Sequence, residues 1–216
     1  DIIMKGFDYS TITEGKLYDV LRPLGKAVCR LRNDVHYVGL ENIPKEGGFI
    51  LASNHLQALD PVYLSIAIEG RQVHYMGKKE LFAKPLVRHV LTKLNGFPVV
   101  RGGADSEALN YAVRLVNEGY IFGIFPEGTR SKDHKPGKAK SGIARIALAS
   151  HADILPVSIY NSDDMKKHTK MTIRFGKLIP FEELKLNEDS GRTEIHAAAD
   201  YIMSKINELW SEGHCE

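Results

Sequence analysis

A chain of 216 residues with 43% hydrophobic content can bury a sizeable core, which excludes an intrinsically disordered protein. The net charge of +2 is uneven: residues 181–216 carry −6, which leaves +8 on residues 1–180. Such a basic balance fits a nucleic acid, a phosphorylated substrate or an anionic membrane. Cys29 and Cys215 belong to no C-x-x-C pair or zinc-ligand set, so we expect a reduced, cytosolic protein without a metal.

The segment from about residue 13 to 32 is basic and amphipathic. Pro23 lies inside it, so we expect a kink or two short helices. Its apolar side could pack on the core or meet an anionic lipid surface, where each basic residue contributes about 1 kcal/mol. We expect peripheral attachment, because no apolar run approaches the roughly 18 residues that span a bilayer. The sequence thus divides into an N-terminal helical segment, residues 1–34, and a main domain, residues 35–216.

In the main domain, short apolar runs alternate with segments of helical periodicity. This alternation predicts an α/β fold with a largely parallel central sheet flanked by helices. The predicted strands are 49–52, 73–76, 97–100, 120–125 and 154–159, with a late strand over 171–175 at an edge or in antiparallel pairing. The predicted helices are 61–68, 80–94, 106–117, 141–149 and 192–210.

A histidine and a carboxylate follow the first predicted strand, in the segment Asn54-His55-Leu56-Gln57-Ala58-Leu59-Asp60. Asp60-Pro61 indicates a helix start, with Asp60 at the N-cap. On one helix the two side chains would lie about 140° apart, but across a turn they can meet. Asp60 would then set the tautomer of His55 and leave its other ring nitrogen free to accept a proton. The alternative is an ordinary turn histidine beside a simple helix cap.

Basic residues follow the next two predicted strands, at Lys78 and Arg101. Ligands of parallel α/β sheets bind at the carboxyl ends of the strands, so these side chains should share one edge with His55. A guanidinium suits bidentate recognition of a phosphate, and Lys78 could add a second contact. Arg101 could instead be a solvated surface group.

The fourth predicted strand ends in the segment Phe125-Pro126-Glu127-Gly128-Thr129-Arg130, so that Glu127 and Arg130 emerge abruptly from a buried element. Gly128 permits a positive φ or the close approach of a substrate. The structural alternative is a tight turn closed by a Glu127–Arg130 ion pair.

Other site classes lack their signatures. The sequence contains no G-x-S-x-G elbow of a serine hydrolase and no H-E-x-x-H zinc motif. Residues 123–128 have the glycine spacing of a P-loop, but Thr129-Arg130 stands where Lys-Ser/Thr is required. Aromatic residues do not interleave with the basic ones as in a base-stacking surface, so we expect no nucleic-acid partner.

Four segments, 54–60, 96–101, 125–130 and 154–157, resemble in order and spacing the four sequence blocks of the glycerolipid acyltransferase superfamily. The chain is similar to the bacterial 1-acylglycerol-3-phosphate (lysophosphatidic acid) acyltransferases over roughly residues 35–176. It departs from them at Pro98, where many relatives carry an aliphatic residue. Many relatives also carry apolar N-terminal membrane segments, a role that falls here to the basic amphipathic segment.

The resemblance implies transfer of a fatty acyl group from acyl-CoA or acyl-carrier protein to the free hydroxyl of lysophosphatidic acid. The product is phosphatidic acid, an intermediate of phospholipid biosynthesis. His55 would be the general base and Asp60 would steady the imidazolium, with no covalent intermediate, cofactor or metal. Glu127 would orient Arg130 or bind the glycerol. The substrate-binding residues that the resemblance implies are Lys78, Arg101, Glu127, Gly128, Thr129 and Arg130.

The partners implied are these substrates and an anionic membrane surface, at the cytoplasmic face of the cell membrane. Two alternatives stay open. The acceptor could be glycerol-3-phosphate or another lysolipid, or the chain could be a noncatalytic membrane lipid-binding protein of the same fold.

Overall fold

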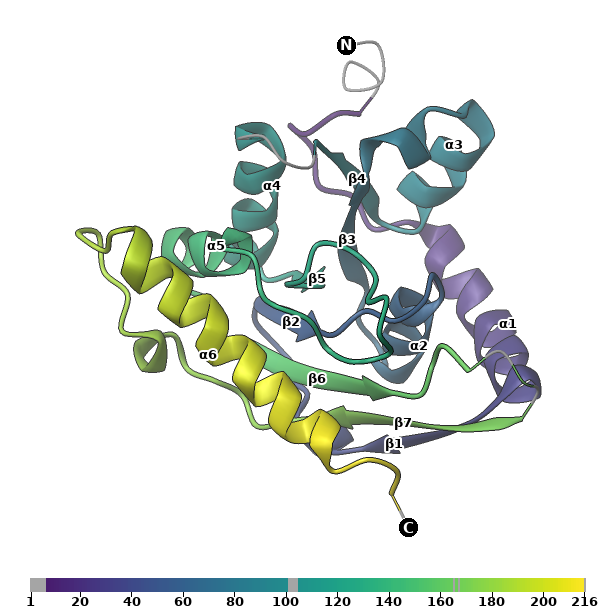
Figure 1. Cartoon of the computed structure of the whole chain (residues 1–216). Helices are drawn as coiled ribbons and strands as arrows, with labels where there is room; N and C mark the ends of the chain where they lie inside the picture. The colour runs from purple at the N-terminus through teal and green to yellow at the C-terminus, as the bar shows by residue number, and fades with distance from the viewer. Residues whose placement is uncertain (1–6, 101–104, 165, 167, 216) are drawn as a thin grey trace.

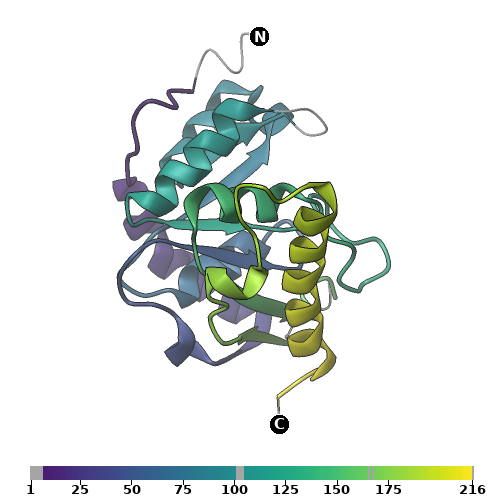
Figure 2. The same ribbon diagram turned by 90° about the vertical axis from the view of Figure 1, so that its left-hand side faces the viewer.

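A computed structural model describes residues 7–100, 105–164, 166 and 168–215. In these residues a central sheet is covered by helices on both faces (Figures 1 and 2). The strands are β1 (Asn33–Val38), β2 (Phe49–Ser53), β3 (Val73–Lys78), β4 (Gly96–Val99), β5 (Ile121–Ile124), β6 (Ile154–Tyr160) and β7 (Thr169–Phe175). The helices are α1 (Lys16–Arg32), α2 (Asp60–Ala67), α3 (Pro85–Lys93), α4 (Ser106–Asn117), α5 (Gly142–Ser150) and α6 (Arg192–Ser211). Short 3₁₀ helices are η2 (Leu40–Asn42), η3 (Lys79–Phe82) and η4 (Phe181–Leu184).

The strands of the sheet follow the order β1-β7-β6-β2-β5-β3-β4. Neighbouring strands from β6 to β4 all run parallel, which confirms the predicted α/β fold with a largely parallel sheet. The late strand, β7, pairs antiparallel with β6 as one of the two predictions had it. It is not at the edge, however, because β1 pairs in parallel along its outer side.

The edge strand β1 is absent from the sequence prediction. Its residues, Asn-Asp-Val-His-Tyr-Val, form no apolar run, and most of them are partly or fully exposed. It follows α1 directly, so the expected boundary between residues 34 and 35 falls inside a strand of the sheet. The N-terminal helix is therefore joined to the domain without a linker.

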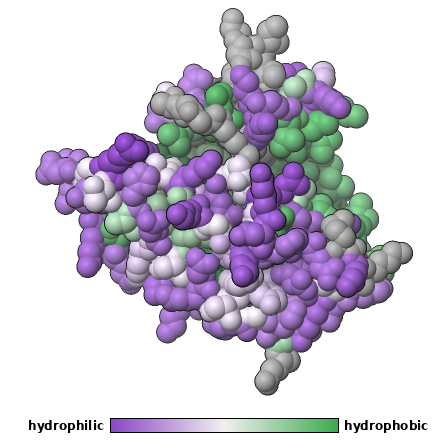
Figure 3. All heavy atoms as spheres, in the orientation of Figure 1, coloured by the Kyte–Doolittle hydropathy of each residue, from purple (hydrophilic) through white to green (hydrophobic). Residues whose placement is uncertain are grey.

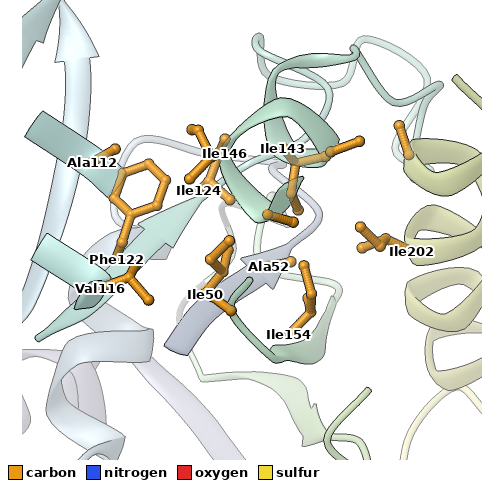
Figure 4. Close-up of a cluster of buried hydrophobic side chains, with 14 of the residues drawn as sticks. Ile50, Ala52, Ala112, Val116, Phe122, Ile124, Ile143, Ile146, Ile154 and Ile202 are labelled. Atoms are coloured by element: carbon orange, nitrogen blue, oxygen red, sulfur yellow. The ribbon is translucent and has the colours of Figure 1, made fainter. Parts of the chain in front are cut away.

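The core lies on both faces of the sheet because the central strands are buried on both sides. On β2, Ile50 and Ala52 face α4, α5 and α6, and pack with Phe122 of β5 (Figure 4). The alternate residues Phe49 and Leu51 belong to the second cluster, which includes buried residues of α2. Such two-sided burial is typical of the interior of a parallel sheet.

The predicted helices are confirmed to within one residue at each end, apart from the one expected over 80–94. That segment is divided into η3 and α3, because Lys84 is extended at φ −86° and ψ 123° and Pro85 begins the second helix. A residue that precedes proline avoids the helical region, and proline cannot continue a helix. The basic segment forms one helix, α1, through Pro23, rather than two.

The apolar residues of α1 and α3 form an exposed surface. Tyr18 and Cys29 anchor α1 in the core, and α1 contacts both α2 and α3. Figure 3 shows hydrophobic residues gathered on the side of the molecule where Figure 1 places α1 and α3. We call this surface the α1–α3 apolar face; its residues are Val20, Leu24, Val28 and Leu31 of α1 with Leu86, Val87 and Val90 of α3.

Candidate active site

The candidate site lies at the carboxyl ends of β2 and β5, which are neighbours in the sheet (Figure 1). Phe49–Ala52 of β2 pair with residues 121–124 of β5, so the loops that follow the two strands leave the sheet side by side. Ser131 in the second loop donates its backbone N–H to the carbonyl of His55 at 2.8 Å. This is the edge at which parallel α/β sheets bind their ligands.

His55 and Asp60 meet across the turn. The imidazole Nδ1 lies 2.9 Å from Asp60 Oδ2, the Asp60 side chain is fully buried, and that of His55 is 15% exposed. A carboxylate on Nδ1 sets the tautomer of a neutral histidine, which leaves Nε2 as the nitrogen that accepts a proton. The pair therefore has the geometry of a general base with its orienting group.

Asp60 does not occupy the expected N-cap. It is the first residue of α2, Leu59 stands in the cap position, and no side chain caps the helix. The carboxylate instead turns back into the preceding loop, where Oδ2 accepts the N–H groups of Leu56 at 2.7 Å and Gln57 at 2.8 Å. Its other oxygen accepts the hydroxyl of Ser162 at 2.7 Å. These donors stabilise a buried negative charge beside His55.

The ring of His55 rests on an aromatic stack. It lies 4.1 Å from the ring of Phe125, at 18° between the planes, and Tyr75 stacks behind Phe125 at 5.9 Å. Gly123 makes room for this stack, because a Cβ there would lie 2.2 Å from the Tyr75 ring. The imidazole is therefore held by Asp60 at one ring nitrogen and by Phe125 on one face.

Glu127 holds the backbone of the turn that carries His55, and it does not pair with Arg130 in the described residues. Its Oε1 accepts the His55 backbone N–H at 3.3 Å, and the Gly137 N–H bonds to the same carboxylate. Burial to 6% exposure raises the pKa of Glu127 to about 7, although both N–H groups act to lower it. The buried Glu127 carboxylate thus faces the His55 backbone while Arg130 is exposed, so in the described residues Glu127 does not hold Arg130 through an ion pair.

Gly128 and Lys140 lie against each other beside this turn. Gly128 has φ +71°, and its N–H donates to the Phe125 carbonyl at 3.0 Å to close a tight turn. A Cβ at this position would lie 3.0 Å from the Nζ of Lys140. Lys140 lies in an irregular loop far from any predicted strand end, so no sequence pattern points to it.

Among the described residues, the predicted phosphate ligands form no hydrogen bond or ion pair with His55 or Asp60. Lys78 ends β3, beside β5, and its Nζ lies 3.8 Å from Glu80 Oε2. Thr129 and Arg130 are exposed after β5. Arg101 lies outside the described residues. The structure thus brings His55, Asp60, Phe125 and Glu127 into contact, and puts Lys78 and Arg130 at the same edge of the sheet.

The chain is similar in sequence to known acyltransferases. A family model described as Acyltransferase matches residues 34–160. The chain is 30% identical over 187 residues to the 1-acyl-sn-glycerol-3-phosphate acyltransferase of Bacillus subtilis (strain 168), covering 85% of this chain and 92% of the relative. It is 26% identical over 187 residues to the enzyme of that name from Streptococcus pneumoniae, covering 84% and 68%.

A solved structure of an acyltransferase has the same fold as this chain. The crystal structure of the 1-acyl-sn-glycerophosphate (LPA) acyltransferase PlsC from Thermotoga maritima superposes with a TM-score of 0.71 at 25% identity, covering 91% of this chain and 79% of that one. Fold and site therefore define an acyltransferase of α/β architecture. The chain belongs to the 1-acyl-sn-glycerol-3-phosphate acyltransferase family, which confirms the resemblance drawn from the four sequence blocks.

Proposed function

We propose that this acyltransferase moves a fatty acyl group from acyl-CoA or acyl-carrier protein to the free hydroxyl of 1-acylglycerol-3-phosphate, giving phosphatidic acid. The observation that carries the proposal is the His55–Asp60 pair, held at 2.9 Å at the ligand-binding edge of the sheet. The names of the relatives from Bacillus subtilis and Thermotoga maritima support the choice of acceptor.

The reaction needs one base, because the acyl donor is a thioester and is already activated towards attack by a hydroxyl. His55 Nε2 takes the proton of the acceptor hydroxyl while its oxygen attacks the thioester carbonyl carbon. The new C–O bond forms a tetrahedral intermediate, and collapse of that intermediate breaks the C–S bond. The imidazolium then returns the proton to the departing thiolate, so the products are the ester and the free thiol. Asp60 stabilises the imidazolium between these steps.

The other residues position the acceptor. Arg101, Arg130 and Lys78 hold its phosphate, and the partly exposed Gly128 and the exposed Thr129 admit the glycerol. A phosphate held at this edge places the hydroxyl against His55, which makes the attack effectively intramolecular. Glu127 serves this geometry by fixing the backbone of His55 rather than by touching the phosphate. No metal or cofactor takes part in this proposal.

The α1–α3 apolar face supports peripheral attachment to an anionic membrane, which we place at the cytoplasmic face of the cell membrane. Leu31 and Leu86 are 74% and 76% exposed, and the same two helices carry exposed basic residues such as Arg30 and Lys93. Apolar side chains that enter a bilayer, together with cations that meet anionic headgroups, are typical of interfacial helices. None of the helices in the described part of the chain combines the length and apolarity needed to span a bilayer.

Product analysis tests the proposed activity. The purified chain is incubated with acyl-CoA or acyl-carrier protein and with lysophosphatidic acid, glycerol-3-phosphate or a neutral lysolipid. Released thiol and acylated product are both measured. We expect phosphatidic acid as the preferred product. Preference for another acceptor would reassign the substrate, and the absence of transfer from any donor would favour a noncatalytic lipid-binding protein.

A further inference from the structure

Ser162 contacts Asp60 from a distant part of the chain. It follows β6, and its hydroxyl donates to Asp60 Oδ1 at 2.7 Å although 102 positions separate the two residues. Ser162 is 2% exposed and Asp60 is 0% exposed, so this hydrogen bond is shielded from water. A hydrogen bond from a hydroxyl to a buried carboxylate is among the stronger kinds, because no solvent competes for it.

The two oxygens of Asp60 have different partners. Oδ2 is shared by the His55 ring and by the N–H groups of Leu56 and Gln57, whereas Oδ1 bonds only to Ser162 among the described residues. Without the Ser162 hydroxyl, Oδ1 would be buried and unpaired, which favours rotation of the carboxylate. Rotation would move Oδ2 away from Nδ1 of His55.

Hydrogen bonds fix the end of β6, and the turn that carries Ser162, relative to the segment that carries His55. Asn54, directly before His55, donates its amide to the Ile159 carbonyl at 2.9 Å and accepts the Ile159 N–H at 2.7 Å. Asn161 has a left-handed backbone, with φ +67°, and its amide donates to the Lys170 carbonyl at 3.0 Å. This turn directs Ser162 towards Asp60, and the Asn54 contacts fix the turn relative to His55.

We propose that Ser162 is a positioning residue of the acyl-transfer reaction, which fixes the plane of the Asp60 carboxylate and through it the ring of His55. This inference rests on the proposed function of the His55–Asp60 pair. It extends that pair to a chain of three side chains, Ser162, Asp60 and His55, contributed by the ends of β6 and β2 and the start of α2.

Kinetics of five variants, namely three single serine variants, Asp60→Asn and a double variant, test the proposal. We expect Ser162→Ala to lower kcat by about 10- to 100-fold, the cost of a small misplacement of a reactive group, with KM changed less than about 2-fold. Ser162→Thr keeps the hydroxyl and should recover most of the activity. Ser158→Ala removes a buried serine within β6 as a control. In an Asp60→Asn background, Ser162→Ala should cost nothing further, whereas a general loss of structure would cost the same in both backgrounds.

A second measurement does not depend on activity. Proton NMR of the whole chain in water follows the Nδ1–H resonance of His55, which is identified by its loss in His55→Ala. We expect Ser162→Ala to shift or broaden this resonance while Ser162→Thr and Ser158→Ala leave it in place. An unchanged resonance, or an unchanged kcat in Ser162→Ala, overturns the role of Ser162. Absence of acyl transfer in the wild type would instead refute the proposed function and leave the NMR result readable.

Discussion

The loops around Asp60 and the α1–α3 apolar face differ in how their side chains are partnered. Around Asp60 the polar groups are buried, and the loop after β2 and Ser162 beyond the end of β6 supply their hydrogen bonds. On the α1–α3 apolar face, side chains such as Leu24 and Leu86 are exposed to solvent. Buried polar groups need fixed partners, whereas exposed apolar groups gain free energy only when another surface covers them. The loops around Asp60 therefore suit catalysis, and the α1–α3 apolar face suits binding to a membrane. Variants in each region should change one of these functions and leave the other unchanged.

The largest effect is expected for Asp60→Asn. The amide cannot hold His55 in the correct tautomer, so kcat should fall by about 10³- to 10⁴-fold, as for other histidine bases that lose their carboxylate. Steady-state kinetics measures the loss, and vesicle flotation should show unchanged membrane binding. An activity within a factor of ten of the wild type would contradict the assignment of Asp60.

Glu127→Gln should change the pH dependence of stability. The ordinary carboxyl pKa of 4.5 is raised to about 7 in the folded state, chiefly by burial. Between these pH values the folded state binds more protons than the unfolded state. The free energy of unfolding of the wild type therefore falls by about 3 kcal/mol as pH rises from 4.5 through 7. Glutamine keeps an acceptor for the His55 N–H without this loss. Urea unfolding should therefore favour the variant more at pH 8 than at pH 5, and an equal difference at both would contradict the account.

The double variant Leu24→Asp/Leu86→Asp should separate docking from chemistry. Each leucine removed from a bilayer costs about 1.5 kcal/mol, so binding to anionic vesicles should weaken by about 100-fold. Turnover of a water-soluble short-chain acyl donor should stay unchanged. Leu40→Asp, at an exposed position on η2, is the matched control. Equal loss in both variants, or no loss in either, would contradict a membrane role for the α1–α3 apolar face.

A smaller effect is expected for Arg130→Ala, which tests phosphate recognition at the site. KM for lysophosphatidic acid should rise by about 10-fold, the loss of one charge-assisted contact, while a neutral lysolipid should be affected less than 2-fold. Arg145→Ala, exposed on α5, controls for a general loss of positive charge. An equal effect on both acceptors would show that Arg130 does not read the phosphate.

Much of the site could be predicted because parallel strands bring their carboxyl ends to one edge. His55 after β2 and Glu127 after β5 follow from that rule, and the strand alternation identifies most of the sheet. Strand β1 could not be predicted, because its exposed, mixed residues carry no apolar run. Whether Arg101 holds a phosphate stays a prediction, since it lies outside the described residues.

The partners of the buried carboxylates could not be predicted from local sequence. Asp60 before Pro61 has the pattern of a helix cap, yet its carboxylate turns back to the loop amides and to Ser162. Glu127 and Arg130 are close in sequence, yet burial directs Glu127 to the His55 backbone. These contacts depend on how distant strand ends meet. Ser162, at the carboxyl end of β6, could have been found by applying the strand-end rule to a hydroxyl as well as to charged residues.

The central claim is that His55 is the base that deprotonates the acceptor. The most direct test is acyl transfer from acyl-CoA to lysophosphatidic acid by His55→Ala, beside His196→Ala, which removes an exposed histidine on α6. We predict that His55→Ala loses at least about 10²-fold in kcat while His196→Ala matches the wild type. Transfer by His55→Ala at the rate of the wild type would contradict the claim.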